Sequence, residues 1–255
     1  MAGELEPVLA QVLFVGVRVS MLMVFAPFFG SLAIPARVKA ALTVMITVLL
    51  YPHYAPRLAL AGPIDWWRVL SGEVAIGLVI GLMVHFIFDG TMLAGQVVGF
   101  QLGFSLANLI DPQSEVDTTV MSIFHQAITL LIFLQLNVHH WILRGLAKSF
   151  EYLPAGAARA TPAATLGLLQ GAGSMLLVAV QIAGPVLVAT VLADIALGYI
   201  GKAAPALPVL FVGFSVKSVL GIAVLGGAVA FWPTVLEGHF LKALAGTERL
   251  LHLVR

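Results

Sequence analysis

The chain has 255 residues, of which 60% are hydrophobic and 10% charged, with a net charge of +1 and a mean hydropathy of +1.05. A soluble domain carries about 25% charged residues, so this composition excludes a soluble enzyme, a disordered protein and a nucleic-acid-binding protein, whose basic residues would be concentrated on one face. The absence of cysteine excludes disulfides, thiolate metal sites and cysteine nucleophiles.

Long windows without Asp, Glu, Lys or Arg follow one another along the chain. A helix needs about 20 apolar residues to cross a membrane. The windows cover 19–36, 40–56, 74–88, 90–110, 118–143, 160–193 and 218–236. They predict an all-α, polytopic membrane protein of about six long, partly kinked helical segments. We expect one membrane-embedded domain over residues 1–255, with its basic C-terminal tail in the cytoplasm.

Proline and glycine mark where these helices end or bend. Linkers are expected at 51–62 and 154–162, and Gly184-Pro185 interrupts the longest window. As one helix, residues 160–193 would span roughly 50 Å, whereas the hydrocarbon core of a bilayer is about 30 Å thick. The segment therefore either bends at this pair or packs partly on protein.

A ladder of small residues lies in the window at 90–110. Gly95, Gly99 and Gly103 are four residues apart, and on a helix this spacing lets two backbones approach closely. The ladder predicts helix packing. The partner is either another helix of the same chain or a neighbouring subunit.

The most polar interruption between two apolar windows is residues 108–119. It contains Asp111, Glu115 and Asp117 and no basic residue. One interpretation is an exposed loop on a membrane face, where most loops lie. The other is a re-entrant loop that lines or plugs a conduit, because irregular backbone at membrane depth is tolerated only where it is buried in protein or faces water.

Charged residues inside apolar segments are costly and are therefore candidates for function. They are Glu73, Asp89, Asp194 and Lys217. Asp194 and Lys217 flank a predicted turn at 201–211, so we expect them to form a buried charge pair across a helical hairpin. A proton relay is the alternative.

No arrangement of residues predicts catalysis. His139 and His140 are adjacent and would point about 100° apart on a helix, which does not suit chelation, and Trp141 beside them favours an interfacial cluster. No HExxH, P-loop or GxSxG motif occurs. We predict no enzyme activity and no catalytic, cofactor-binding or metal site.

The order of the motifs is more specific than any one of them. They are Arg18, Pro27-Phe28-Phe29-Gly30, Ile34-Pro35-Ala36-Arg37, Gly72-Glu73, Gly77, Gly81, Ala94-Gly95-Gln96, Gly99, Gly103-Phe104-Ser105-Leu106-Ala107, Asp111-Pro112, Leu136-Asn137-Val138-His139-His140, Ser149-Phe150, Pro154-Ala155-Gly156, Pro205, Gly213 and Lys217. In this order the chain resembles, over nearly its whole length, the FliR family of export-gate membrane proteins in the bacterial flagellar type III secretion apparatus. It departs from the family pattern at Val138, Ala206, Pro208 and Ser215.

The resemblance implies a structural pore or gate subunit that passes unfolded flagellar proteins across the inner (cytoplasmic) membrane at the flagellar basal body. It implies a hetero-oligomeric complex with FliP-like and FliQ-like subunits, contact with an FlhB-like protein, and an assembly that rises partly above the bilayer. It also implies a FliP-like part at 1–200, followed by 201–255, which completes a FliQ-like C-terminal hairpin.

The resemblance further implies a plug loop within residues 103–122. Its gate residues would be Gly103, Phe104, Ser105, Asn108, Asp111, Pro112, Glu115 and Asp117. The alternative function is a proton-coupled secondary transporter that uses Asp89, Asp194 and Lys217, since broken helices also occur in transporters. A clear inverted repeat, which such transporters show, is missing from the sequence. A membrane enzyme built on His139 and His140 would lack further ligands.

Overall fold

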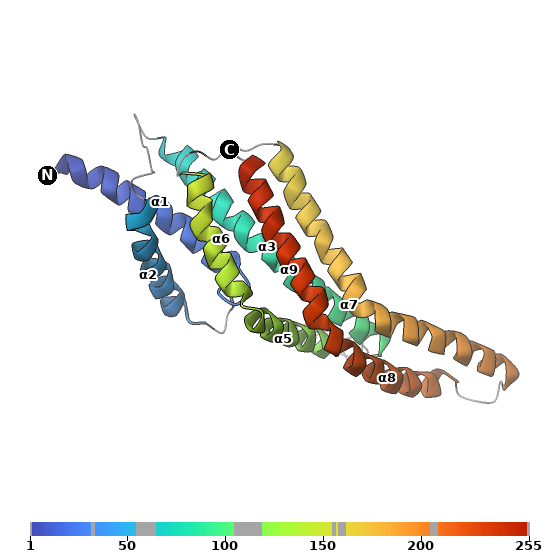
Figure 1. Cartoon of the computed structure of the whole chain (residues 1–255). Coiled ribbons are helices and arrows are strands. Elements are labelled where there is room, and N and C mark those ends of the chain that lie inside the picture. The colour runs from blue at the N-terminus through green and yellow to red at the C-terminus, as the bar shows by residue number, and fades with distance from the viewer. Residues whose placement is uncertain are drawn as a thin grey trace. The chain divides into compact units, whose positions relative to one another are not determined.

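The computed structural model describes residues 2–31, 34–54, 65–104, 119–154, 157, 162–204 and 209–253. In these ranges the chain is almost entirely helical and contains no strand (Figure 1). The helices are α1 (Ala2–Phe25), α2 (Ala36–Tyr54), α3 (Trp66–Gln101), α5 (Val120–Gln135), α6 (Val138–Tyr152), α7 (Pro162–Ala203), α8 (Val209–Ala228), the 3-10 helix η2 (Val229–Phe231) and α9 (Trp232–Leu253).

Several of these helices are long and apolar enough to cross a membrane. Within the described ranges four qualify, at Val8–Phe25, Trp66–Gln101, Thr165–Ala203 and Val212–Leu253, or five if α5 and α6 together form one broken span. The predicted all-α, polytopic membrane architecture is confirmed.

Individual helix boundaries differ from the sequence expectations. The windows at 74–88 and 90–110 form one helix, α3, because the single charge at Asp89 does not interrupt the backbone hydrogen bonding of a helix. The window at 118–143 is instead broken between α5 and α6, where Asn137 adopts a left-handed φ of 55°. Pro233 is the second residue of α9, which directly follows the 3-10 turn η2 inside the continuous helical run Val212–Leu253, and it removes one backbone N–H donor there.

The described chain divides into two compact units, each built from several separate segments. Unit 1 is Met1–Phe86, Leu134–Gly173 and Phe240–Arg255, and unit 2 is Ile87–Phe133 and Ser174–His239. The helices α3, α7 and α9 each contribute to both units. The proposed division at residue 200 stays a prediction.

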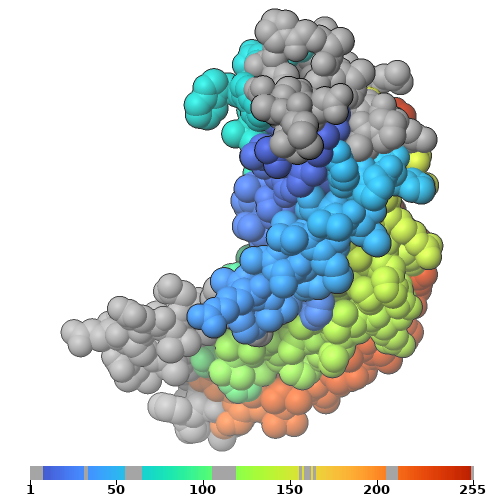
Figure 2. Space-filling model, turned by 90° about the vertical axis from the view of Figure 1, so that its left-hand side faces the viewer, coloured from blue at the N-terminus to red at the C-terminus, as the bar shows by residue number. Residues whose placement is uncertain are grey.

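Unit 1 is held together by close approach of α3 to α1. A Cβ added at Gly77 would lie 2.5 Å from the carbonyl oxygen of Arg18, and one added at Gly81 would lie 2.8 Å from the Cβ of Phe25. Only glycine leaves room for such backbone contact. On the face shown in Figure 2, α2 (light blue) lies at the surface beside α6 (yellow-green).

Unit 2 contains the C-terminal part of α3 packed on α5 and α7. The rings of Phe88 and Phe133 meet edge to face with centroids 5.5 Å apart, and a Cβ added at Gly90 would lie 2.6 Å from the carbonyl oxygen of Met175. The end of α3 and the start of α5 precede and follow the predicted plug loop in the sequence.

Candidate functional site

The predicted plug loop leaves α3 through a tight turn. Gly103 has φ 83°, a left-handed conformation that favours glycine. The N–H of Phe104 donates to the carbonyl of Gly99 at 2.9 Å, which closes the last turn of the helix. Of the predicted gate residues, Gly103 and Phe104 are thus placed at the loop entrance. The others lie outside the described residues, namely Ser105, Asn108, Asp111, Pro112, Glu115 and Asp117.

The loop returns to the helices at Thr119, which caps the start of α5. The backbone N–H of Ser122 donates to Thr119 Oγ1 at 3.2 Å, and the two hydroxyls lie 2.8 Å apart. A side-chain oxygen at this position satisfies an otherwise unpaired N–H of the first turn. A Cβ added at Gly99 would lie 3.1 Å from Thr119 Oγ1. The two ends of the loop therefore meet, and we call residues 99–104 and 119–122 the loop stem.

The glycine ladder packs within the chain. A Cβ added at Gly95 would lie 2.6 Å from the Cα of Ser122 and 2.7 Å from the carbonyl oxygen of Met121. Gly95 and Gly99 therefore face the start of α5, and Gly103 lies beyond the end of α3 in the turn. This is the intramolecular alternative for the ladder. Its consequence is that α3 and α5 are in backbone contact beside the loop.

The structure brings Asp194 and Lys217 together next to the stem. Lys217 Nζ lies 2.9 Å from Asp194 Oδ1, which links α8 to α7, and the Asp194 side chain is 47% exposed rather than buried within this chain. The Gln101 amide at the end of α3 donates to the same carboxylate at 3.5 Å. The Ser218 hydroxyl donates to the carbonyl of Leu102 at 2.8 Å. One polar cluster thus ties the end of α3 to α7 and α8.

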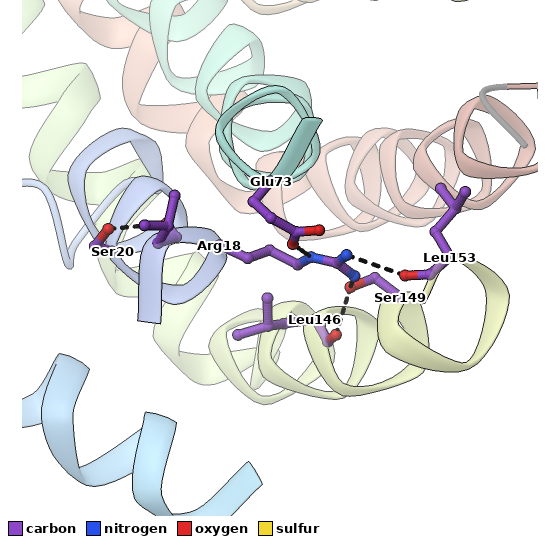
Figure 3. Close-up of polar contacts among 7 residues, drawn as sticks. Arg18, Ser20, Glu73, Leu146, Ser149 and Leu153 are labelled. Atoms are coloured by element: carbon purple, nitrogen blue, oxygen red, sulfur yellow. Dashed lines mark hydrogen bonds and ion pairs between the residues drawn. The ribbon is translucent and has the colours of Figure 1, made fainter. Parts of the chain in front are cut away.

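Sequence reasoning missed a second ion pair, in unit 1. Arg18 of α1 donates from Nε to Glu73 Oε2 of α3 at 2.6 Å, and both side chains are 0% exposed (Figure 3). The same guanidinium donates to Ser149 Oγ and to the carbonyl of Leu153, each at 3.0 Å, and lies 4.0 Å from the centre of the Phe150 ring. Arg18 is the lone basic residue of the apolar window Val8–Phe25, which was the available signal.

Both clusters link helices to one another. Arg18, which is fully buried, donates to acceptors of α3 and α6. Asp194 and Ser218 bond to Gln101 and to the carbonyl of Leu102 at the end of α3. Within the described ranges, no three His, Asp or Glu side chains lie close enough together to hold a metal ion. What the arrangement does is to anchor both ends of an acidic loop on well-packed helices.

The chain is similar in sequence to a family of bacterial export proteins over most of its length. Residues 9–243 match the family described as "Bacterial export proteins, family 1". A flagellar biosynthetic protein FliR from Pectobacterium carotovorum subsp. carotovorum is 31% identical over 88% of this chain and 86% of its own length. Those from Escherichia coli and Bacillus subtilis are 29% and 27% identical, over 82% and 95% of this chain and 80% and 95% of their own lengths.

Proposed function

The chain belongs to family 1 of the bacterial export proteins, and from this we propose that it is a structural pore or gate subunit of the flagellar type III protein export apparatus. Its cargo is unfolded flagellar proteins, which it passes across the bacterial inner membrane at the flagellar basal body. Its partners are FliP-like and FliQ-like subunits of the same pore complex and an FlhB-like protein. The chain acts by conformational gating, with no chemical step of its own.

The loop stem is the observation that carries the gate role. Residues 105–118 include Asp111, Glu115 and Asp117 and no basic residue, and the described residues that precede and follow them approach each other where Gly99 faces Thr119. Packed helices hold the described residues on both sides of this acidic sequence, so the loop stem provides the two fixed attachment points that a gate segment requires. A polar segment so placed fits a gate that blocks a conduit at rest.

The polar cluster beside the stem supports this role. Ser218 holds the carbonyl of Leu102, and Lys217 pairs with Asp194, so α7 and α8 restrain the entrance of the loop. A displacement of α8 relative to α7 would therefore reach the loop entrance through hydrogen bonds. We propose that this connection links the C-terminal hairpin to the plug.

Deletion of residues 112–118 in cells tests the proposed plug. We expect ion leakage across the inner membrane to rise, because the segment that blocks the lumen is shortened, while secretion of flagellar proteins changes. Leakage is measured as the growth defect and dye uptake of cells that express the variant, and secretion as flagellar protein in the culture medium. The matched control removes the equally long segment 56–62 from the proline-rich linker.

The outcome that rejects the plug role is unchanged leakage together with unchanged secretion at a normal level of the variant chain. If the deleted chain does not accumulate, a variant with Asp111, Glu115 and Asp117 replaced by Asn, Gln and Asn provides the same test without shortening the loop. Ser218→Ala, which removes the hydroxyl that holds Leu102, should raise leakage in the same direction but to a smaller extent.

A further inference from the structure

Helix α6 presents two basic side chains on its outer face. Its inner face is buried through Val138, Ile142, Leu146, Ser149 and Phe150. Arg144 and Lys148 lie four residues apart on the opposite, exposed side, so both project from the same part of the helix surface. We call these two residues the basic pair.

An apolar groove lies on each side of the basic pair. The α6–α9 groove has a volume of about 260 Å³ and is lined by both basic residues together with Trp141, Tyr152, Leu244 and Leu251. The α2–α6 groove, of about 380 Å³, is lined by Arg144 with Ile46, Leu49, Leu50, Leu143 and Ala147. Arg144 therefore stands between two grooves that run along the same helix, and both lie within unit 1.

We propose that this surface binds one anionic phospholipid, with its phosphodiester group on Arg144 and Lys148 and one acyl chain in each groove. The inference goes beyond the proposed gate role and does not depend on it. A two-chain lipid is the occupant whose shape matches a charged centre with an apolar channel on either side. Basic pockets between membrane helices are known to hold anionic head groups.

The charges around the pair favour a phosphate ligand. Glu248 also lines the α6–α9 groove. Its Oε1 lies 3.8 Å from Lys148 Nζ, and the Glu248 and Lys148 side chains are 48% and 58% exposed. Such an exposed, long ion pair contributes little energy, so Lys148 is available to an incoming phosphate. The α2–α6 groove is lined by His140 beside Arg144.

The remaining lining suits the boundary between head group and acyl chain. Trp141 and Tyr152 are side chains that gather at membrane interfaces, where one end of the ring is apolar and the other wet. Gly145 lies between Trp141 and Lys148 in the α6–α9 groove, and a Cβ added there would meet nothing within 4 Å. The groove is thus open at the point where an acyl chain would leave the head group.

Quenching of Trp141 by lipids with brominated acyl chains tests the proposal. The full chain, isolated in mild detergent with the subunits that co-purify, is titrated with brominated phosphatidylglycerol or brominated phosphatidylcholine. The signal of Trp141→Phe is subtracted to isolate this one indole. We expect phosphatidylglycerol to quench Trp141 at a lower mole fraction than phosphatidylcholine, because only the former carries a net negative charge.

Variants separate the charge from the groove. Arg144→Gln and Lys148→Gln each remove one basic side chain, and each should reduce the preference for phosphatidylglycerol about fivefold. Glu248→Gln removes the carboxylate that pairs with Lys148 and should increase this preference. Gly145→Leu fills the open groove and should reduce quenching by both lipids.

Two variants serve as matched controls. Lys242→Gln changes a basic residue of α9 outside both grooves, and Gly173→Leu changes a helical glycine where an added Cβ would also meet nothing within 4 Å. Neither control should change the quenching.

Three results would overturn the proposal. Equal quenching by the two lipids, unchanged by the basic-pair variants and by Glu248→Gln, would show that no head group is recognised. Release of brominated phosphatidylglycerol by millimolar inorganic phosphate would show a site for free phosphate. Absence of any Trp141 quenching in the co-purified complex would show that a protein subunit, and not a lipid, covers α6.

Discussion

At the scale of single residues, the strongest constraint is the Arg18–Glu73 pair. Two ionised groups in a dry site are costly unless each is hydrogen-bonded as well as paired. Arg18 meets this condition through Ser149 and the carbonyl of Leu153, and the Phe150 ring covers the guanidinium. The pair joins α1, α3 and α6, so its loss would loosen three helices of unit 1 together.

Removal of one member of the Arg18–Glu73 pair should therefore destabilise the chain more than removal of both members. Arg18→Met or Glu73→Leu leaves one buried charge without its partner, which costs about 3–5 kcal/mol. The double variant Arg18→Met with Glu73→Leu should recover part of this loss. Thermal unfolding of the purified chain in detergent, followed by loss of the monodisperse elution peak, measures the order.

The control for this series is Glu248→Gln, which removes an exposed ion pair in the same unit. It should shift the unfolding temperature very little. A double variant that is less stable than both single variants would contradict the assignment of the pair as a mutually compensating unit.

At the scale of elements, α3 is organised by where its glycines touch other helices. Gly77 and Gly81 meet α1, and Gly95 and Gly99 meet the start of α5. The contacts are not equivalent. At Gly95 the obstacles are backbone atoms, which cannot move aside, whereas at Gly99 the nearest atom is the side-chain oxygen of Thr119.

This difference predicts that replacement of each glycine by alanine lowers the stability of the chain to a different extent. Gly95→Ala should destabilise the chain by about 1–3 kcal/mol through overpacking and should disturb the loop stem, whereas Gly99→Ala should have a smaller effect. Gly198→Ala in α7, where an added Cβ meets nothing within 4 Å, should be neutral or slightly stabilising because alanine favours helix.

The order is measured by thermal unfolding of the three variants under one set of conditions. Equal effects of Gly95→Ala and Gly198→Ala would contradict the packing of α3 on α5. Assembly with partner subunits on native gels supplies an independent measurement, in which Gly99→Leu should also reduce the amount of complex.

At the scale of the whole molecule, apolar side chains remain exposed over more helix than a bilayer covers. Helix α7 has 42 residues, which is about 63 Å, against a hydrocarbon core of about 30 Å. Leu166 near its start is 60% exposed and Tyr199 near its end is 71% exposed. We therefore predict that protein partners cover part of the apolar surface of α7.

Site-specific photo-crosslinking tests this prediction. A photoreactive residue at Leu166 or Tyr199, introduced one at a time in cells, should form a protein adduct from at least one of the two positions. The absence of native cysteine allows a second test with single-cysteine variants and disulfide crosslinking to candidate partners. The control position is Phe14 in the core of unit 1, which is 0% exposed and should form no adduct with another chain.

Adducts that contain only lipid at both ends of α7 would contradict the predicted protein cover. They would also count against assembly into a pore complex. Identification of the adduct by mass gives the partner directly, and a FliP-like or FliQ-like subunit is the expected result.

The sequence by itself determined the membrane class, the helical architecture and the family. Composition and apolar runs are local properties, and the order of glycine and proline motifs extends over most of the chain, so neither depends on which helices touch. The pairing of Asp194 with Lys217 could also be predicted from the sequence, because a short predicted turn joins the segments that carry them.

Only the tertiary structure decided which distant residues meet. Arg18 pairs with Glu73 and Gly95 packs on Ser122, while the two ends of the acidic loop join at Gly99 and Thr119. The grooves on either side of α6 likewise exist only where α2 and α9 lie against it. The physical reason is that an apolar helix with a weak amphipathic pattern does not encode its partner. The match of backbone shape, and the need to neutralise each buried charge, select the partner only when the helices pack.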